Sequence, residues 1–336
     1  MRVCIVGAGA IGGLLGARLA VAGQEVSVLA RGDHLGAIRA SGLQLIEPDG
    51  SVIVAPDVAG ADDLTLLGEQ DLVVLAVKAH QIGEIADRLP SLYHGDTVVL
   101  TLQNGIPWWF FQKFPGPFEG HRLTTLDADG RLERHIPAER IVGCIAYPAA
   151  RREAPGVIRL VDGDRFPVGE LDGQRSDRVK AIAEMLSAAG FVSRVVTDLR
   201  SQLWVKAWGN LAMNPISALT GATLAEIANH PAGRELAARM MSEAAEIAEA
   251  LGLHLRVSIE QRIEGAGKVG DHKTSMLQDV EAGNSLEIDA LIGAFVELGA
   301  LVEVPMPATE TVLALVSLLD SLRDRRTGRR GAGVAP

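Results

Sequence analysis

The chain opens with a glycine-rich loop between an apolar run and a helical pattern, an arrangement that few folds accommodate. Val3 to Val6 predict a buried strand, and Ile11 to Ala22 predict a helix. The loop between them has the form G-x-G-x-x-G. In this context the first glycine permits a tight turn, the second lets the backbone approach a pyrophosphate, and the third lets helix and strand pack closely. The helix N-terminus then faces the phosphates. The sequence therefore predicts a dinucleotide site at Gly7, Ala8, Gly9, Ala10, Ile11 and Gly12; a glycine-rich turn without a ligand is the alternative.

The residues after the second apolar run predict which dinucleotide is bound. An NAD-binding protein would place an acidic residue there for the ribose hydroxyls, but here the chain reads Ala30-Arg31-Gly32. Arg31 suits a 2′-phosphate, and the nearby Asp33 is a candidate for a ribose hydroxyl. We therefore expect NADPH in preference to NADH, with an ordinary surface arginine at position 31 as the alternative.

The order of the apolar runs predicts an α/β domain followed by an all-α domain. As far as about Leu199, short apolar runs alternate with helical patterns, which indicates a Rossmann domain with a doubly wound, mostly parallel sheet. The runs are Val3 to Val6, Glu25 to Leu29, Leu72 to Val77, Thr97 to Leu102 and Ile141 to Tyr147. From Gln202 to Leu322 the pattern is helical. We expect a Rossmann domain at 1–198, a helical domain at 199–325 and a flexible Gly/Arg-rich tail at 326–336.

Composition excludes several classes of partner. The formal net charge of −10 disfavours a nucleic-acid partner, because phosphate binding needs a dense Lys/Arg surface. Two cysteines, Cys4 and Cys144, are too few for a disulfide framework or a metal cluster. The sequence shows neither a charged leader with a cleavage site nor an apolar stretch of membrane-spanning length. These features predict a protein of the reducing cytoplasm, with no bound metal and no membrane partner.

Further polar residues form a wider pattern. They are Val77-Lys78-Ala79-His80-Gln81, Gln103-Asn104-Gly105, the trio Lys206, Asn210 and Asn214, then Ser275-Met276-Leu277-Gln278-Asp279 and Glu287-Ile288-Asp289. In order and approximate spacing, over Met1 to Leu301, this set resembles the ketopantoate reductase family. The resemblance implies an NADPH-dependent oxidoreductase that reduces 2-dehydropantoate, a 2-oxo acid, to pantoate in pantothenate biosynthesis. It also implies a C-terminal domain of the 6-phosphogluconate dehydrogenase type, an active site between the two domains, and a homodimer.

The resemblance assigns roles residue by residue. Lys206 corresponds to the proton donor, and Glu287 to a carboxylate beside the nicotinamide ribose that keeps the lysine charged. Substrate contacts fall on Asn104, Asn210, Asn214 and Ser275. Contacts to the cofactor fall on Lys78, Gln81, Asn104, Ala150 and Glu287.

Each of these residues also has an ordinary structural interpretation. Lys206, Asn210 and Asn214 are four apart and share one stripe of a helix, which Pro215 is expected to bend or stop. A solvated polar face is the alternative there, although the intervening Trp208 and its apolar neighbours indicate a buried helix. Local structure also accounts for the remaining positions, through an Asn-Gly turn at Asn104, an exposed helix start at Lys78, a helix cap at Ser275 and a capping box from Asn284 to Glu287.

Two departures from the family pattern leave the substrate open. Pro107 to Glu139 contributes roughly twenty additional residues, including the aromatic cluster Trp108 to Phe111, which would cover the substrate, contact a second subunit or pack on the Rossmann domain. Leu224 stands where many family members carry asparagine. An NADPH reductase of a different 2-oxo acid or ketone is therefore the second hypothesis. A non-catalytic NADP-binding regulator is the third, and the joint presence of Lys206, Asn104 and Glu287 argues against it.

Overall fold

A computed structural model describes residues 1–327 of the chain. These residues form two compact units that divide between Leu199 and Arg200. From residue 328 onward the tail expected at 326–336 lies outside the described residues.

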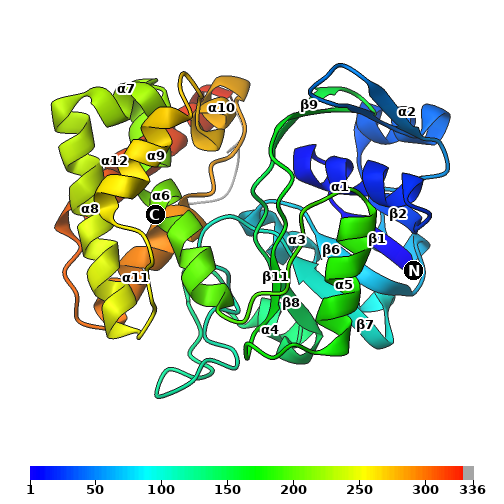
Figure 1. The fold of residues 1–336 in the computed structure, drawn as a ribbon, viewed down its shortest axis with the longest axis horizontal. Helices are drawn as coiled ribbons and strands as arrows, with labels where there is room; N and C mark the ends of the chain where they lie inside the picture. Colours follow the sequence, from blue (N-terminus) through cyan, green and yellow to red (C-terminus); the bar gives the residue numbers. More distant parts are fainter. Residues whose placement is uncertain (328–336) are drawn as a thin grey trace. The chain divides into compact units, whose positions relative to one another are not determined.

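The first unit is built on a seven-stranded sheet with the strand order β11-β8-β7-β6-β1-β2-β5. Every neighbouring pair is parallel except β11 and β8, which are antiparallel. The strands are β1 Arg2–Val6, β2 Glu25–Leu29, β5 Ala59–Ala61, β6 Gln70–Leu75, β7 Tyr93–Thr101, β8 Ile141–Cys144 and β11 Val168–Glu170. The longer helices are α1 Ala10–Val21, α2 Gly32–Ser41 and α5 Asp177–Ala188, which lie beside the sheet in Figure 1. The Rossmann fold predicted from the alternating pattern is confirmed.

Short helical segments connect these elements. They are η1 Leu64–Leu66, η2 Ala79–Gln81, α3 Ile82–Ile85, η3 Ala86–Leu92, α4 Arg131–His135 and η4 Ala138–Arg140.

A second, four-stranded sheet covers α1, and no pattern in the sequence predicted it. Its strands, in spatial order, are β4 Val52–Ala55, β3 Leu43–Ile46, β10 Val157–Asp162 and β9 Ala149–Ala154. Glycines on α1 admit this sheet at close range. A Cβ on Gly13 would lie 2.6 Å from Ile158 Cγ1, and one on Gly16 would lie 3.2 Å from Leu43 Cδ1. The N-terminal helix is therefore packed between two sheets.

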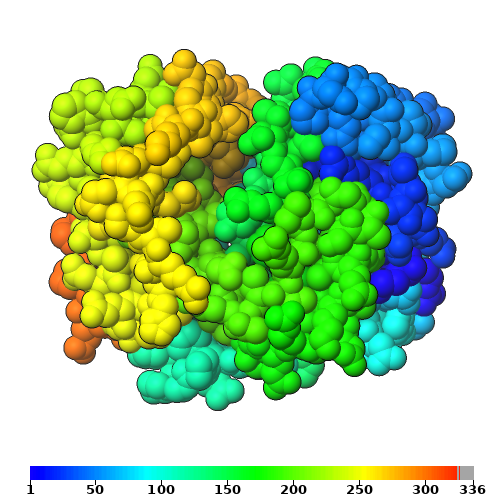
Figure 2. All heavy atoms as spheres, viewed as in Figure 1, coloured from blue at the N-terminus to red at the C-terminus, as the bar shows by residue number. Residues whose placement is uncertain are grey.

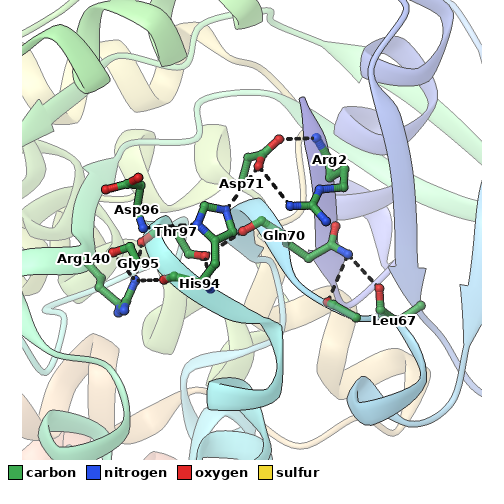
Figure 3. A network of polar contacts seen from close by, with 10 residues as sticks. Arg2, Leu67, Gln70, Asp71, His94, Gly95, Asp96, Thr97 and Arg140 are labelled. Atoms are coloured by element: carbon green, nitrogen blue, oxygen red, sulfur yellow. Dashed lines mark hydrogen bonds and ion pairs between the residues drawn. The ribbon is translucent and has the colours of Figure 1, made fainter.

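A polar network joins the amino ends of β1, β6 and β7 (Figure 3). The Asp71 carboxylate accepts from the Arg2 backbone N–H at 2.7 Å, and its other oxygen lies 3.2 Å from His94 Nε2. The hydrogen bond from Arg2 is the main reason that the pKa of Asp71 lies below its ordinary value. Thr97 Oγ1 donates to the Gln70 carbonyl at 2.7 Å, and Arg140 donates to the carbonyls of His94 and Thr97. This network holds the amino ends of the strands together, and the glycine loop lies at their opposite, carboxyl ends.

The aromatic cluster of the insertion is buried. Trp109 donates from Nε1 to Thr101 Oγ1 at 3.1 Å, and the rings of Phe110, Phe111 and Phe114 pack on one another with centroids 5.1 to 5.9 Å apart. The buried Asp127 carboxylate accepts the N–H groups of Leu132 and Glu133 and so begins α4. Packing within the first unit is therefore the interpretation that the structure supports for the cluster.

The second unit consists of helices arranged around α6. The elements are α6 Leu199–Thr220, α7 Leu224–Asn229, α8 Pro231–Ala250, α9 Ile259–Lys268, α10 Ser275–Ala282, the π-helical η5 Asp289–Gly293, α11 Ala294–Leu301 and α12 Pro307–Thr327. Trp208 of α6 donates to the Met241 carbonyl of α8 at 2.6 Å, and the Trp204 ring meets Phe295 of α11 edge-on at 4.9 Å. Helices α8 and α9 lie side by side at the surface of this unit, in yellow-green and yellow in Figure 2. The all-α second unit is thus confirmed.

The sequence predicted a bend or a stop of α6 at Pro215, and the stop does not occur, because the helix continues to Thr220. A proline removes one N–H from the helix, and the packing of a buried segment can outweigh that loss. Among the helices of residues 1–327, none is long and apolar enough to cross a membrane.

Candidate active site

The three glycines of the loop have three different environments. Gly7 has φ +105°, and a Cβ there would lie 2.7 Å from Val77 Cγ1, so only glycine fits. A Cβ on Gly12 would lie 2.0 Å from the Gly7 carbonyl oxygen, which shows how closely α1 packs on the end of β1. Gly9 has φ −67°, and a Cβ there would meet nothing within 4 Å. The loop therefore has a turn, a close packing contact and open space where a pyrophosphate-binding loop needs each of them.

The loop is held by backbone contacts from neighbouring elements. The Ala8 N–H donates to the Leu29 carbonyl at the end of β2 at 3.1 Å. The Ala8 carbonyl lies 2.7 Å from Nε2 of His34, a buried residue in the first turn of α2. His34 was not among the residues predicted from the sequence, because no local pattern predicts the backbone partners that this side chain finds.

The predicted cofactor residues of the first unit follow adjacent parallel strands. Val6 of β1 pairs with Leu29 of β2 and Leu75 of β6, and Leu75 pairs with Thr101 of β7. The carboxyl ends of these strands therefore share one edge, which is where open α/β sheets bind ligands. The residues that follow the strands along this edge are Gly7 to Gly12, Arg31, Lys78, Gln81 and Asn104.

Two glutamines fix the positions of their neighbours at this edge. Gln81 Oε1 accepts the Lys78 backbone N–H at 3.2 Å, which closes the turn that carries the half-buried Lys78. Gln103 Nε2 donates to the carbonyls of Leu75 and Val77 at 2.9 and 3.1 Å, so it ties the end of β7 to the end of β6. Asn104 follows directly and is half-buried.

Arg31 and Ala150 lie on separate elements of the first unit. Arg31 is exposed at the N-cap of α2, directly after β2. Ala150 lies in β9, where it pairs with Leu160 of β10 and packs against the core cluster that includes α1.

The predicted residues of the second unit start from α6. Lys206 and Asn210 are half-buried, whereas Asn214 is only 5% exposed. Asn214 Nδ2 donates to Ser275 Oγ at 3.4 Å, so the structure brings together two predicted substrate residues that are 61 positions apart. Glu287 is half-buried and lies directly before the helical segment that begins at Ile288.

Two of the ordinary structural interpretations are wrong. Ser275 does not cap α10, because Thr274 Oγ1 accepts the Leu277 N–H at 3.2 Å and Ser275 is the first helical residue. Asn284 and Glu287 do not form a capping box, because Glu287 precedes the helix and its carbonyl accepts the Leu291 N–H at 3.1 Å. The side chains of Ser275 and Glu287 therefore do not take the capping roles that were the alternative interpretations of these residues.

Leu224 begins α7 and is half-buried. Thr223 and Glu226 form a capping box around it, and its own N–H donates to the His272 carbonyl at 3.0 Å. This departure from the family pattern thus lies on a well-fixed backbone.

A mostly parallel α/β sheet with this loop at the carboxyl ends of its strands, followed by an all-helical unit, defines a dinucleotide-binding protein of the Rossmann type. Comparison with known sequences specifies the class further. The model described as Ketopantoate reductase PanE/ApbA matches residues 3–173, and the model described as Ketopantoate reductase PanE/ApbA C terminal matches residues 198–320. The chain belongs to the ketopantoate reductase family.

Individual relatives cover nearly the whole chain. A protein of Mesorhizobium japonicum named 2-dehydropantoate 2-reductase is 51% identical over 320 residues, which is 95% of this chain and 98% of that one. One of the same name from Halobacterium salinarum is 30% identical over 95% of this chain and 98% of its own length. The crystal structure of 2-dehydropantoate 2-reductase from Geobacter metallireducens matches with a TM-score of 0.83 at 28% identity, covering 95% of this chain and 100% of that one.

Proposed function

We propose that this protein reduces 2-dehydropantoate to pantoate with NADPH. The observation that carries the proposal is the glycine loop, whose open space at Gly9 lies at the carboxyl edge of a parallel sheet. The relative that is 51% identical over almost its full length supports the choice of substrate. The family membership supports an oxidoreductase in preference to a regulator.

The first unit supplies the cofactor site in this proposal. The backbone of Gly7 to Gly12 and the N-terminus of α1 hold the pyrophosphate. Arg31 binds the 2′-phosphate, with Lys78, Gln81 and Ala150 as further contacts. When bound, NADPH supplies the hydride that reduces the keto carbon of the substrate.

The second unit supplies the proton and most of the substrate contacts. Lys206 stabilises the negative charge that grows on the keto oxygen and delivers the proton to it. Glu287 keeps the lysine in its charged form. Because the Asn214 amide donates to Ser275 Oγ, the serine hydroxyl is oriented and keeps its own proton for a substrate oxygen. Asn104 and Asn210 complete the proposed substrate contacts.

A direct assay tests this function against the second and third hypotheses. Purified protein is mixed with NADPH and a panel of 2-oxo acids and ketones, and cofactor oxidation is followed by absorbance. Turnover of 2-dehydropantoate above the rest of the panel is the expected result. Preference for a different compound would establish the second hypothesis, for which Leu224 is the relevant departure. Binding of NADPH without turnover of any compound would establish the regulator.

The choice of cofactor has its own test. Replacing Arg31 with alanine removes the guanidinium proposed for the 2′-phosphate and is expected to weaken NADPH binding about tenfold or more, because charged hydrogen bonds contribute about 1.5–3 kcal/mol. NADH lacks this phosphate, so its affinity is expected to stay unchanged. An equal loss for both cofactors would contradict the assignment.

We also propose that the protein resides in the cytoplasm. Its two cysteines, Cys4 and Cys144, are both buried and free, which fits a reducing compartment.

A further inference from the structure

A buried histidine of the first unit contacts the cofactor loop but has no role in the proposed function. His34 lies in the first turn of α2, three residues after Arg31, and is 7% exposed. Both of its ring nitrogens have backbone partners. Nε2 lies 2.7 Å from the Ala8 carbonyl oxygen in the cofactor loop, and Nδ1 accepts the Gly156 N–H at 2.9 Å.

These two partners define the protonation state of the ring. Because Gly156 donates to Nδ1, that nitrogen carries a lone pair and the proton of the neutral ring is on Nε2. Nε2–H therefore donates to the Ala8 carbonyl. Burial is the main cause that lowers the pKa of His34; the hydrogen bond to the Ala8 carbonyl opposes it, and the charge of Arg152 adds to the lowering. The neutral tautomer is thus the form that satisfies both contacts.

The ring cannot shift easily between its partners. Gly156 lies in the tight turn between β9 and β10, where its carbonyl accepts the Gln44 N–H at 2.9 Å. A Cβ on Gly156 would lie 3.0 Å from Ala37 Cβ of α2, so this turn is packed directly on the helix that carries His34. The second sheet and α2 together therefore hold the imidazole in place against the loop.

The hydrogen bond to Ala8 determines the direction of the next amide. The Ala8 carbonyl and the Gly9 N–H belong to one peptide group, and the described chain contains no cis peptide. In a planar trans peptide the carbonyl oxygen and the N–H point in opposite directions. A donor that holds the Ala8 oxygen therefore turns the Gly9 N–H to the other side, and it also polarises that N–H. The Ala8 N–H is itself held by Leu29, so the residue is fixed at both its backbone polar groups.

We propose that His34 is a positioning residue for the dinucleotide: through the Ala8 carbonyl it directs the Gly9 N–H at the cofactor pyrophosphate. The inference rests on the proposed NADPH binding and adds to it a residue that does not touch the cofactor. A bound pyrophosphate accepts from a backbone donor that is already oriented, so binding does not carry the entropic cost of ordering the loop.

Two amide variants separate the two contacts of the ring. In His34→Gln the side-chain amide reaches the position of Nε2, so it keeps a donor for Ala8 and gives up the acceptor for Gly156. In His34→Asn the shorter side chain places its oxygen at the position of Nδ1, so it keeps the acceptor for Gly156 and loses the donor to Ala8. Both are neutral, and thermal unfolding of each establishes that it is folded at the temperature of the binding experiment.

Binding is measured by fluorescence titration with NADPH, without substrate and without turnover. His34→Asn is expected to raise the Kd for NADPH about tenfold, whereas His34→Gln stays within about threefold of wild type, in line with the loss or retention of one hydrogen bond. Adenosine 2′-monophosphate, which carries the phosphate proposed for Arg31 but no pyrophosphate, is expected to bind wild type and both variants equally.

Any result that departs from these expectations overturns a defined part of the proposal. If both variants bind NADPH as tightly as wild type, or if His34→Gln loses as much as His34→Asn, the donor to Ala8 does not position the loop. If His34→Asn also weakens adenosine 2′-monophosphate tenfold, the ring acts through α2 and Arg31 instead. If wild type itself does not bind NADPH, the proposed function fails and this inference fails with it.

Discussion

At the scale of single residues, the proposed cofactor site depends on backbone positions more than on side chains. Gly7, Gly9 and Gly12 lie within six residues, yet they differ in what requires glycine. Gly7 has a positive φ, Gly9 borders open space, and Gly12 packs closely on the backbone of Gly7. The motif gives the spacing of these glycines but not which of them tolerates a side chain. The structure supplies that distinction, and it can be measured.

Replacing Gly9 with alanine is expected to separate binding from stability. A Cβ at this position meets nothing within 4 Å and φ is −67°, so the free energy of unfolding should stay within about 0.5 kcal/mol of wild type. The new methyl group enters the space proposed for the pyrophosphate, so the Kd for NADPH should rise at least about tenfold. Chemical denaturation and fluorescence titration give the two values. Tight NADPH binding by the variant would contradict the placement of the pyrophosphate.

His34 is expected to make stability depend on pH. Burial lowers the pKa of His34 in the folded protein below the ordinary value of 6.5, which applies to the unfolded chain. At a pH between these two pKa values, the unfolded chain therefore binds more protons than the folded one. The contribution is complete above pH 6.5 and is lost as the pH falls toward the pKa of the folded state. The free energy of unfolding of wild type should therefore drop across this window more steeply than that of His34→Gln, which does not titrate there. The free energies come from denaturant titrations at several pH values. If they fall equally with pH in wild type and in His34→Gln, the pKa of the ring does not differ between the folded and unfolded states.

Long-range partners set the limit of prediction from sequence at this scale. Arg31 could be proposed for the 2′-phosphate because its place after a strand is a local feature of the sequence. His34 lies three residues further on but accepts from Gly156, 122 positions away. No local pattern gives that partner.

At the scale of elements, α1 has to fit between two sheets. Its glycines face β1 through Gly12 and the second sheet through Gly13 and Gly16, at distances too short for most side chains. The helix is therefore specified less by helix propensity, which glycine disfavours, than by what packs on it.

Two glycine-to-alanine variants with opposite expected effects test this. Gly12→Ala would place its Cβ 2.0 Å from the Gly7 carbonyl oxygen, a backbone atom, so it should cost at least about 1–3 kcal/mol of unfolding free energy. Gly36→Ala lies within α2, is exposed and meets nothing within 4 Å, so it should stabilise by about 0.4–1 kcal/mol. Urea denaturation of both compares them. A neutral Gly12→Ala would mean that α1 can move away from β1 without cost.

The predicted elements show which signals the sequence carries. The strands β1, β2, β6, β7 and β8 were expected because their apolar runs are buried. Strand β9 was not, since it reads Ala-Ala-Arg-Arg-Glu-Ala and four of its six residues are exposed at a sheet edge. Its neighbour β10 pairs in parallel with β3, which lies more than one hundred positions earlier. No local pattern in either strand predicts that pairing. Of the bend or stop expected at Pro215, the stop was wrong for a related reason, because the tertiary packing of α6 overrides a local signal.

At the scale of the whole molecule, the described chain divides the proposed chemistry between two units. The residues proposed for phosphate binding, Gly7 to Gly12 and Arg31, belong to the first unit, and Lys206, Asn214 and Ser275 belong to the second. The helical spacing of Lys206, Asn210 and Asn214 was readable from the sequence. The contact of Asn214 with Ser275 was not, and only the resemblance to the family placed Ser275 in the same set.

This division makes Lys206 the residue at which binding and catalysis should separate most cleanly. Replacing it with alanine removes the proposed proton donor, so kcat should fall by about 10²–10⁴-fold, the usual contribution of a general acid. Affinity for NADPH should stay unchanged, because the residues proposed to hold the phosphates lie in the other unit. Lys206→Arg is the matched control: it keeps the positive charge, but a guanidinium does not release its proton at neutral pH, so turnover should remain low. Recovery of turnover in the arginine variant would mean that position 206 acts through charge alone, and near-normal turnover in the alanine variant would remove Lys206 from the mechanism.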